Sequence, residues 1–96
     1  MLESKFQRKV IEEVERMFPD CVIIKTDPTY IWSFPDLVVF IDSNYAVLET
    51  KRRADSDKQP NQGYYVGLLD DMSFSRFINQ DNFEEVMDEL ARAFKT

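Results

Sequence analysis

Residues 33–51 constrain the fold of this chain more than any other stretch, because they read as two strands joined by a short polar turn. Pro35-Asp36 is tolerated at the start of a strand, where the missing proline N–H removes no ladder hydrogen bond. The unbroken apolar run 37–41 that follows is typical of a strand buried on both faces. Residues 42–44 favour a tight turn, and residues 45–51 form the returning strand. The stretch therefore predicts a β-hairpin around which the other elements are arranged.

Three charged residues lie at the open end of this hairpin. Side chains alternate between the two faces of a strand, so Asp36, Glu49 and Lys51 are expected on one face. A two-residue turn at Asp42-Ser43 would place Asp36 opposite Glu49. A turn at Ser43-Asn44 would place it opposite Lys51 instead. Both registers put two carboxylates and an ammonium group beside an apolar core, which costs free energy unless a partner compensates them. A divalent cation, which prefers oxygen ligands, is such a partner.

The composition excludes several classes of enzyme. With 96 residues, 44% of them hydrophobic and 31% charged, the chain is expected to be a single globular domain, 1–96. It has no histidine and one cysteine, which excludes a Ser/His/Asp triad, an HNH nuclease and an internal disulfide, and which argues strongly against a zinc site of protein ligands. The net charge of −6 argues against non-specific coating of nucleic acid, but bound cations can cancel charge at a local site. The polar N-terminus and the short apolar runs predict a cytoplasmic protein that is not attached to a membrane.

Hydrophobic periodicity predicts the remaining elements. Apolar residues at helical spacing indicate a helix over residues 3–18, and residues 21–25 read as a strand ahead of the hairpin. A second helix is expected from residue 60, a fourth strand over 73–78, and a final helix after residue 82. The order is helix, three strands, helix, strand, helix, which predicts an α/β fold with a mixed sheet flanked by helices.

Three features have two interpretations each. Glu3 lies on the apolar side of the first helix, either as a first-turn acid favoured by the helix dipole or as a third carboxylate over the hairpin. The aromatic loop 29–34 either packs into the core or stacks on bases. Gly63 and Gly67 either allow the close approach of a second copy of the chain or pack against the chain's own last helix.

The hairpin sequence Pro35-Asp36 … Glu49-Thr50-Lys51 resembles the motif of the PD-(D/E)XK nucleases. The predicted order of elements resembles the αβββαβ core of the restriction-endonuclease-like fold, with one helix added at the C-terminus. The resemblance therefore covers essentially the whole chain. The chain most resembles the small VRR-NUC-like members of the family, which are common in phages and are often associated with Holliday-junction resolution.

Smaller matches support the resemblance, and one departure weakens it. The chain is similar to this family in its N-terminal acidic helix, represented by Glu3 with Phe6-Gln7. It also has the PDL form of the metal motif, as Pro35-Asp36-Leu37. On the helix after the motif it has a glutamine followed by an aromatic three residues later, as Gln62 with Tyr65 and Leu68. Ser33 stands where the family often has glycine, which puts in doubt how the backbone would meet DNA.

The resemblance implies metal-assisted hydrolysis of phosphodiester bonds. Mg²⁺ or Mn²⁺ would be held by two carboxylates, a backbone carbonyl and the N-terminal acid, namely Asp36, Glu49, Thr50 and Glu3. Lys51 would orient the attacking water or offset charge on the phosphate, and Gln62 would position water or phosphate. Three basic residues of the following loop, Arg52, Arg53 and Lys58, would hold the DNA backbone.

The same resemblance implies DNA as the partner, and branched or structured DNA is the expected substrate. A four-way junction has paired strands to cut, so a homodimer with two sites is expected. The alternative is a catalytically inactive module of the same fold that binds DNA or a host protein. A purely structural α/β domain with a coincidental motif is a third interpretation. The implied location is the cytoplasm, as a phage or bacterial protein.

Overall fold

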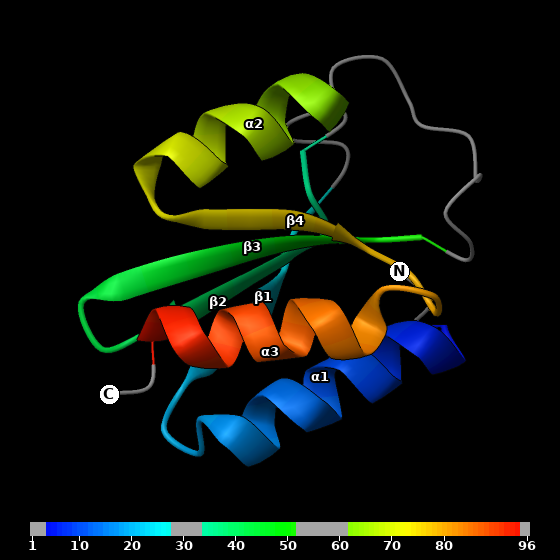
Figure 1. Ribbon diagram of the computed structural model, residues 1–96, viewed down its shortest axis with the longest axis vertical. Helices are drawn as coiled ribbons and strands as arrows, with labels where there is room; N and C mark the ends of the chain where they lie inside the picture. Colours follow the sequence, from blue (N-terminus) through cyan, green and yellow to red (C-terminus); the bar gives the residue numbers. More distant parts are fainter. Residues whose placement is uncertain (1–3, 28–33, 52–61, 95–96) are drawn as a thin grey trace.

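The computed structural model describes residues 4–27, 34–51 and 62–94, and the account below concerns these residues. Seven elements follow one another as α1 (Lys5–Met17), β1 (Val22–Lys25), β2 (Leu37–Ile41), β3 (Asn44–Thr50), α2 (Gln62–Met72), β4 (Phe74–Ile78) and α3 (Phe83–Phe94). The strands form one mixed sheet in the order β1-β2-β3-β4, with helices on both faces (Figure 1). The prediction of an α/β fold with the element order αβββαβα is confirmed.

The hairpin register follows the first of the two predicted turns. Ile41 pairs with Asn44 in the antiparallel β2–β3 ladder, so Asp42 and Ser43 form the two-residue turn. Asp42 has a φ of 53°, a left-handed conformation that aspartate tolerates better than most residues. Pairing of Leu37 with Leu48 ends the ladder, and the next opposed residues are Asp36 and Glu49. The two acidic residues are therefore neighbours because of the turn.

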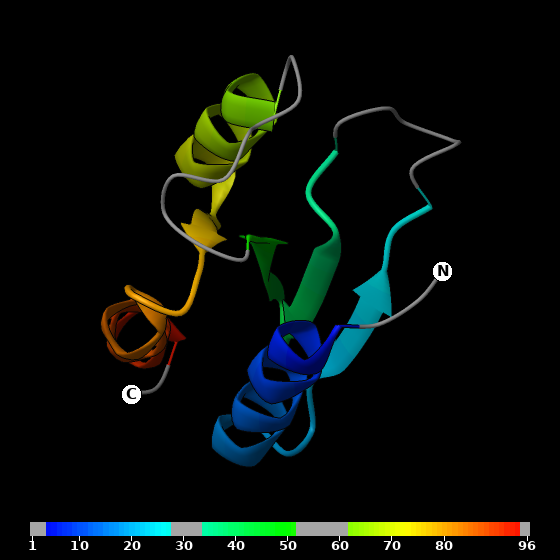
Figure 2. The same cartoon turned by 90° about the vertical axis from the view of Figure 1, so that its right-hand side faces the viewer.

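A parallel connection completes the sheet. β3 and β4 run parallel, and α2 forms the crossover between them. Figures 1 and 2 show α1 and α3 on one face of the sheet and α2 on the other. The amino-terminal ends of all three helices lie over the end of the sheet where β3 and β4 finish (Figure 1). The positive ends of the helix dipoles therefore point toward this end of the molecule.

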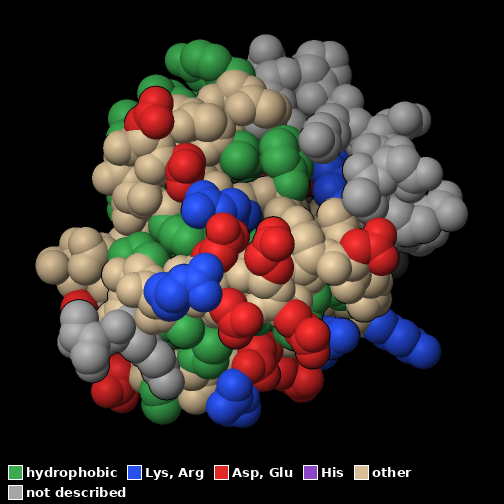
Figure 3. All heavy atoms as spheres, in the orientation of Figure 1, with side chains coloured by type: hydrophobic (Ala, Val, Ile, Leu, Met, Phe, Trp, Pro, Cys, Tyr) green, Lys and Arg blue, Asp and Glu red, His purple; other side chains and the backbone are tan. Residues whose placement is uncertain are grey.

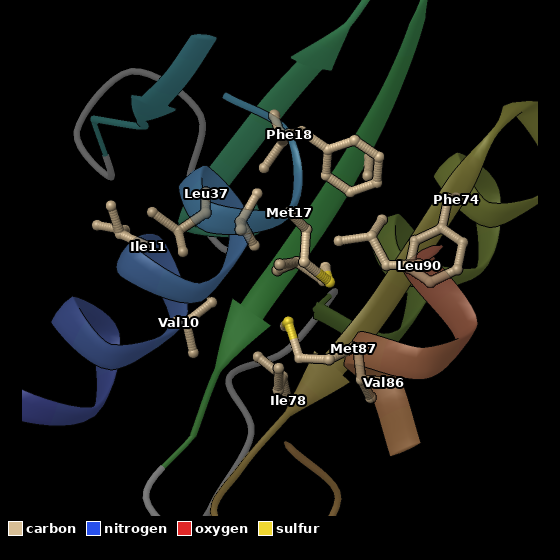
Figure 4. Packing of buried hydrophobic residues seen from close by; sticks show 14 of the residues in the cluster. Val10, Ile11, Met17, Phe18, Leu37, Phe74, Ile78, Val86, Met87 and Leu90 are labelled. Atoms are coloured by element: carbon tan, nitrogen blue, oxygen red, sulfur yellow. The ribbon is translucent and has the colours of Figure 1, made fainter. Parts of the chain in front are cut away.

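The main core lies between the sheet and the pair α1 and α3 (Figure 4). Val10 and Val14 of α1 have no exposed surface, because apolar residues recur at helical spacing along one side of that helix. They pack with the inward-facing residues of β2 and β3, such as Val39 and Leu48, and with Leu90 of α3. This packing fixes the position of α1 relative to the hairpin.

The prediction that β2 is buried on both faces is wrong. Leu37, Val39 and Ile41 are buried on the side of α1 and α3, but Val38 is only half-buried and Phe40 is 45% exposed. The physical reason is that α2 packs mainly over β3 and β4, so within the described residues the outer face of β2 is covered only in part. An apolar run therefore marked a strand correctly, but did not show how many layers cover it.

Candidate active site

Asp36 is the residue that joins the hairpin to α1. It directly precedes β2, and its Oδ1 accepts a hydrogen bond from the Thr50 N–H at 3.0 Å. Its Oδ2 accepts bonds from the Thr50 hydroxyl and, at 2.7 Å, from Nε2 of Gln7 on α1. Because Asp36 lies outside the β2 ladder, its carboxylate is oriented by these donors rather than by strand alternation. The carboxylate is held from β3 and from α1 at once.

Glu49 is a buried acid at the end of β3, with 6% of its surface exposed. Its Oε1 accepts a hydrogen bond from the Asp36 N–H at 3.1 Å, and its Oε2 lies 3.4 Å from Nζ of Lys51. Burial and, secondly, the nearby charge of Asp36 raise the pKa of Glu49 to about 7, although Lys51 acts in the opposite direction. A carboxyl group in this state releases its proton close to neutral pH and responds strongly to a cation placed beside it.

Lys51 is positioned by the backbone that follows β3. Its N–H donates to the carbonyl of Ile78 at 2.8 Å, which continues the pairing of β3 with β4 by one residue. The side chain is largely buried, so its ammonium group is held near Glu49 rather than extended into water. The structure therefore brings the three charged residues of the hairpin motif, Asp36, Glu49 and Lys51, to one end of the sheet as predicted.

Gln7 belongs to this cluster, although the sequence interpretation did not assign it to the site. It is 5% exposed and donates to Asp36 through Nε2, while its Oε1 has no hydrogen-bond partner among the residues that the structure describes. Two signals in the sequence could have indicated it. Gln7 lies on the apolar side of the first helix, and it stands three residues after Ser4, in the pattern of a capping box.

The start of α1 differs from the prediction. The helix begins at Lys5, and Ser4 is its N-cap, with its hydroxyl oxygen accepting from the Gln7 N–H at 2.9 Å. The predicted start at residue 3 is too early, because the pattern Ser4-Lys5-Phe6-Gln7 makes Ser4 the N-cap. The cap places the first turn of α1 beside the end of β3.

A pocket of about 300 Å³ lies between these two elements. It is lined by the first turn of α1 and the end of the β3 segment, namely Ser4, Lys5, Phe6, Thr50 and Lys51. Two lysines and the positive end of a helix dipole border the same space, which favours an anion such as a phosphate group. The carboxylate cluster and an anion pocket are therefore adjacent through Thr50 and Lys51.

The structure brings some of the predicted site residues together, whereas others lie outside the residues that it describes. Asp36, Glu49, Thr50 and Lys51 are brought together. Thr50 orients Asp36 through its N–H and hydroxyl, a contribution that the sequence interpretation, which considered only its carbonyl, did not foresee. Gln62 is the first residue of α2, which begins over the same end of the sheet, but its side chain is not described (Figure 1). The remaining predicted residues, Glu3, Arg52, Arg53 and Lys58, lie outside the described ranges.

The donors at this cluster suit a hard divalent cation. In residues 4–27, 34–51 and 62–94, no three Asp, Glu, Cys or His side chains converge as a metal site. The charges of Asp36 and Glu49 do interact there, and the amide of Gln7 bonds Asp36 through Nε2 while its buried Oε1 lacks a partner in these ranges. Carboxylate and amide oxygens are the ligands that Mg²⁺ and Mn²⁺ prefer, and Mg²⁺ is often bound by one or two carboxylates only.

Comparison with known proteins identifies no relative. Searches against protein-family models, curated proteins and solved structures give no significant match to this chain. Among the described helices, none has the length and apolar character needed to cross a membrane. The class that the fold defines is thus a small α/β protein with a four-stranded mixed sheet and three helices, and its function has to be inferred from the cluster at the sheet end.

Proposed function

We propose that this protein is a divalent-metal-dependent endonuclease that hydrolyses DNA phosphodiester bonds in the manner of the PD-(D/E)XK nucleases. The observation that supports it most is the position of Asp36, Glu49 and Lys51 at one end of the β2–β3 hairpin, with Glu49 buried and its pKa raised to about 7. A buried carboxyl group next to a second, half-buried carboxylate and a lysine is costly for a purely structural domain. The same arrangement is suited to holding Mg²⁺ or Mn²⁺ next to a phosphate.

Residues of the chain have separate roles in this reaction. Asp36 and Glu49 hold the cation, which when bound polarises the phosphate and acidifies the attacking water. Thr50 keeps the Asp36 carboxylate in one orientation through its N–H and hydroxyl. Lys51 orients the attacking water or offsets negative charge that develops on the phosphate. Lys5, on the far side of the pocket from the β3 end, contributes a second positive charge for the phosphate backbone.

The charge distribution limits how DNA can approach. Acidic side chains gather over α1 and α3 on the face shown in Figure 3, and exposed examples on these helices are Glu12, Glu15, Glu84, Glu85 and Asp88. A polyanion is repelled from such a surface. The end of the sheet differs from this surface, because the helix N-termini point there and Lys5 and Lys51 line its pocket, next to two carboxylates whose charge a bound cation would offset. DNA is therefore expected to bind at the sheet end and to be positioned further by Arg52, Arg53 and Lys58.

The decisive experiment is a cleavage panel with Mg²⁺ or Mn²⁺ and four labelled substrates: a four-way junction, a flap, single-stranded DNA and a linear duplex. The resemblance to VRR-NUC-like enzymes favours the junction as the best substrate. Chelation by EDTA should stop cleavage. Binding of DNA without cleavage of any substrate would instead support the inactive nuclease-fold module. The proposed setting of this activity is the bacterial cytoplasm, where such DNA is present.

Glu3 is proposed to assist the metal site from the N-terminal side, and this gives a prediction with a matched control. Glu3→Gln should lower metal-dependent cleavage by at least about 10-fold, in the range found for groups that support a metal site. Glu15→Gln, at an exposed position of α1, should leave the rate unchanged. Initial rates at saturating DNA are the measurement. Equal rates for the two variants would mean that Glu3 takes no part in the metal site.

A homodimer with two sites is proposed for cleavage of paired strands. The alternative in which Gly63 and Gly67 pack against the last helix is wrong, because both are exposed and, within the described ranges, a methyl group at either position would meet no atom within 4 Å beyond the neighbouring backbone of α2. The reason is that α3 lies on the opposite face of the sheet from α2 (Figure 2). The exposed side chains of Tyr64 and Met72 add apolar surface to α2.

Light scattering at micromolar concentration tests this proposal, and a mass of two chains is expected. Gly67→Arg, which places a charged side chain on the open side of α2, should shift the protein to a monomer without unfolding it. The matched control is Ala93→Arg, at an exposed position on α3. A monomeric mass for the wild-type protein, with and without junction DNA, would exclude the paired-site arrangement.

A further inference from the structure

Gln7 carries a buried polar atom whose role the described fold does not explain. Its side chain is 5% exposed, and Oε1 has no hydrogen-bond partner within the described ranges. An unpaired buried amide oxygen is costly, and such groups in native proteins usually have a structural or functional explanation. The other buried side-chain oxygen without a partner in these ranges is Oγ of Ser75 on β4, where the neighbouring acid, Asp70, accepts from the Ser75 N–H and is already paired with Arg76.

The orientation of the Gln7 amide is fixed by its neighbour. A carboxylate only accepts hydrogen bonds, so the amide must turn its NH₂ group to Asp36, as the 2.7 Å bond to Oδ2 shows. This leaves Oε1 as the free atom of an amide group that is anchored at the carboxylate cluster. The oxygen is thus held in place rather than free to rotate into water.

Gln7 could form a capping-box hydrogen bond at the start of α1, but it does not do so among the described residues. In a capping box, the glutamine three residues after the N-cap returns its side chain to the N-cap N–H. Ser4 fulfils its half of that pattern, because its hydroxyl oxygen accepts from the Gln7 N–H. Gln7 does not complete the box, since Oε1 accepts no hydrogen bond among the described residues. Its amide is directed instead to Asp36.

We infer that Oε1 of Gln7 is an oxygen donor to the divalent cation, acting together with the carboxylates of Asp36 and Glu49. Neutral amide oxygens are suitable ligands for hard cations, and a cation would give this oxygen the partner that the described residues do not provide. The donor set would contain one neutral and two charged groups from α1, β2 and β3. This inference rests on the proposed function, because it assumes that a cation binds at the cluster.

Calorimetric titration of the DNA-free protein with MnCl₂ and MgCl₂ tests whether Gln7 binds the cation. Gln7→Met keeps the length of the side chain and removes both polar atoms, so we expect cation affinity to fall by at least about 10-fold. The melting temperature without cation should change by less than about 3 °C, because the variant also removes a buried unpaired oxygen. Gln80→Met, at an exposed position between β4 and α3, is the matched control and should bind like the wild type.

The variant Gln7→Glu distinguishes two possible roles of Gln7: donating an oxygen to the cation, or only positioning Asp36. It keeps the oxygen but loses the NH₂ group that bonds Asp36, so a positioning role predicts weak binding, as for Gln7→Met. A donor role predicts that Gln7→Glu binds Mn²⁺ at least as tightly as the wild type, because a charged oxygen replaces a neutral one. If Gln7→Met fails to fold, this second comparison decides alone.

The outcomes distinguish the inference from the function on which it rests. Wild-type affinity in Gln7→Met, or tenfold weaker binding in Gln7→Glu, would overturn the role of Gln7 and leave the nuclease proposal intact. Absence of any cation binding by the wild type would overturn both. Tight binding by the wild type and by Gln7→Glu, with weak binding by Gln7→Met, would support both.

Discussion

Asp36→Asn, Glu49→Gln and Lys51→Ala are each expected to lower metal-dependent DNA cleavage by at least about 100-fold, the loss typical when one charged group at a reacting centre is removed. Asp36→Asn and Glu49→Gln remove the charges that would hold the cation. Lys51→Ala removes the ammonium group 3.4 Å from Oε2 of Glu49. The measurement is the initial rate on the best substrate of the cleavage panel, at saturating Mg²⁺.

These variants are expected to fold. In Asp36→Asn, the new amide group meets Gln7, whose side chain can rotate by half a turn and accept through Oε1. Asp20→Asn and Glu15→Gln, at exposed positions, are the matched controls and should keep full activity. Circular dichroism and melting temperature establish that a low rate does not result from unfolding. Full activity in a folded Asp36→Asn variant would end the nuclease proposal.

The second large effect concerns stability without metal. The pKa of Glu49 is about 7 in the folded protein, against an ordinary value of 4.5, because burial and the charge of Asp36 disfavour its ionised form, while Lys51 partly offsets them. A carboxyl group with a raised pKa binds its proton more tightly when folded than when unfolded. Its contribution to the free energy of unfolding is therefore constant below about pH 4.5, falls as the pH rises to about 7, and is constant again above it.

Glu49→Gln isolates this contribution, because glutamine resembles the protonated acid and does not titrate. Near pH 5 the variant and the wild type should have similar stability, and at pH 8 the variant should be more stable by roughly 2–3 kcal/mol. Urea unfolding in EDTA at a series of pH values gives this difference. Glu15→Gln, at an exposed position of α1, serves as the control. A flat difference for Glu49→Gln would mean that Glu49 ionises as an ordinary surface acid does.

The local pattern of the sequence was sufficient to predict most of the secondary-structure elements. The apolar run over 37–41 and the polar turn after it predicted β2 and the hairpin, because the alternation and turn chemistry of strands are local properties. Helical spacing of residues such as Val10 and Val14 predicted α1 for the same reason. The placement of Asp36, Glu49 and Lys51 at one end of the sheet also follows from counting residues on either side of a turn.

Other properties depended on contacts between segments that are distant in the sequence. The pattern allowed two turns, and the structure has Asp42-Ser43, which makes Glu49 rather than Lys51 the residue opposite Asp36. Coverage of β2 could not be read from its own residues, because it depends on where α2 crosses the sheet. The exposure of Gly63 and Gly67 likewise could not be predicted locally, because it depends on the placement of α3 on the opposite face of the sheet.

The sequence by itself therefore determined the elements, their order and the end of the sheet where the charged residues meet. Only the tertiary structure decided the membership and electrostatics of that cluster. Gln7 lies 29 positions before Asp36 and reaches it because the buried stripe of α1 fixes the rotation of that helix against β2 and β3. The raised pKa of Glu49 has the same origin, since burial depends on the layers packed around a side chain and not on its neighbours in sequence.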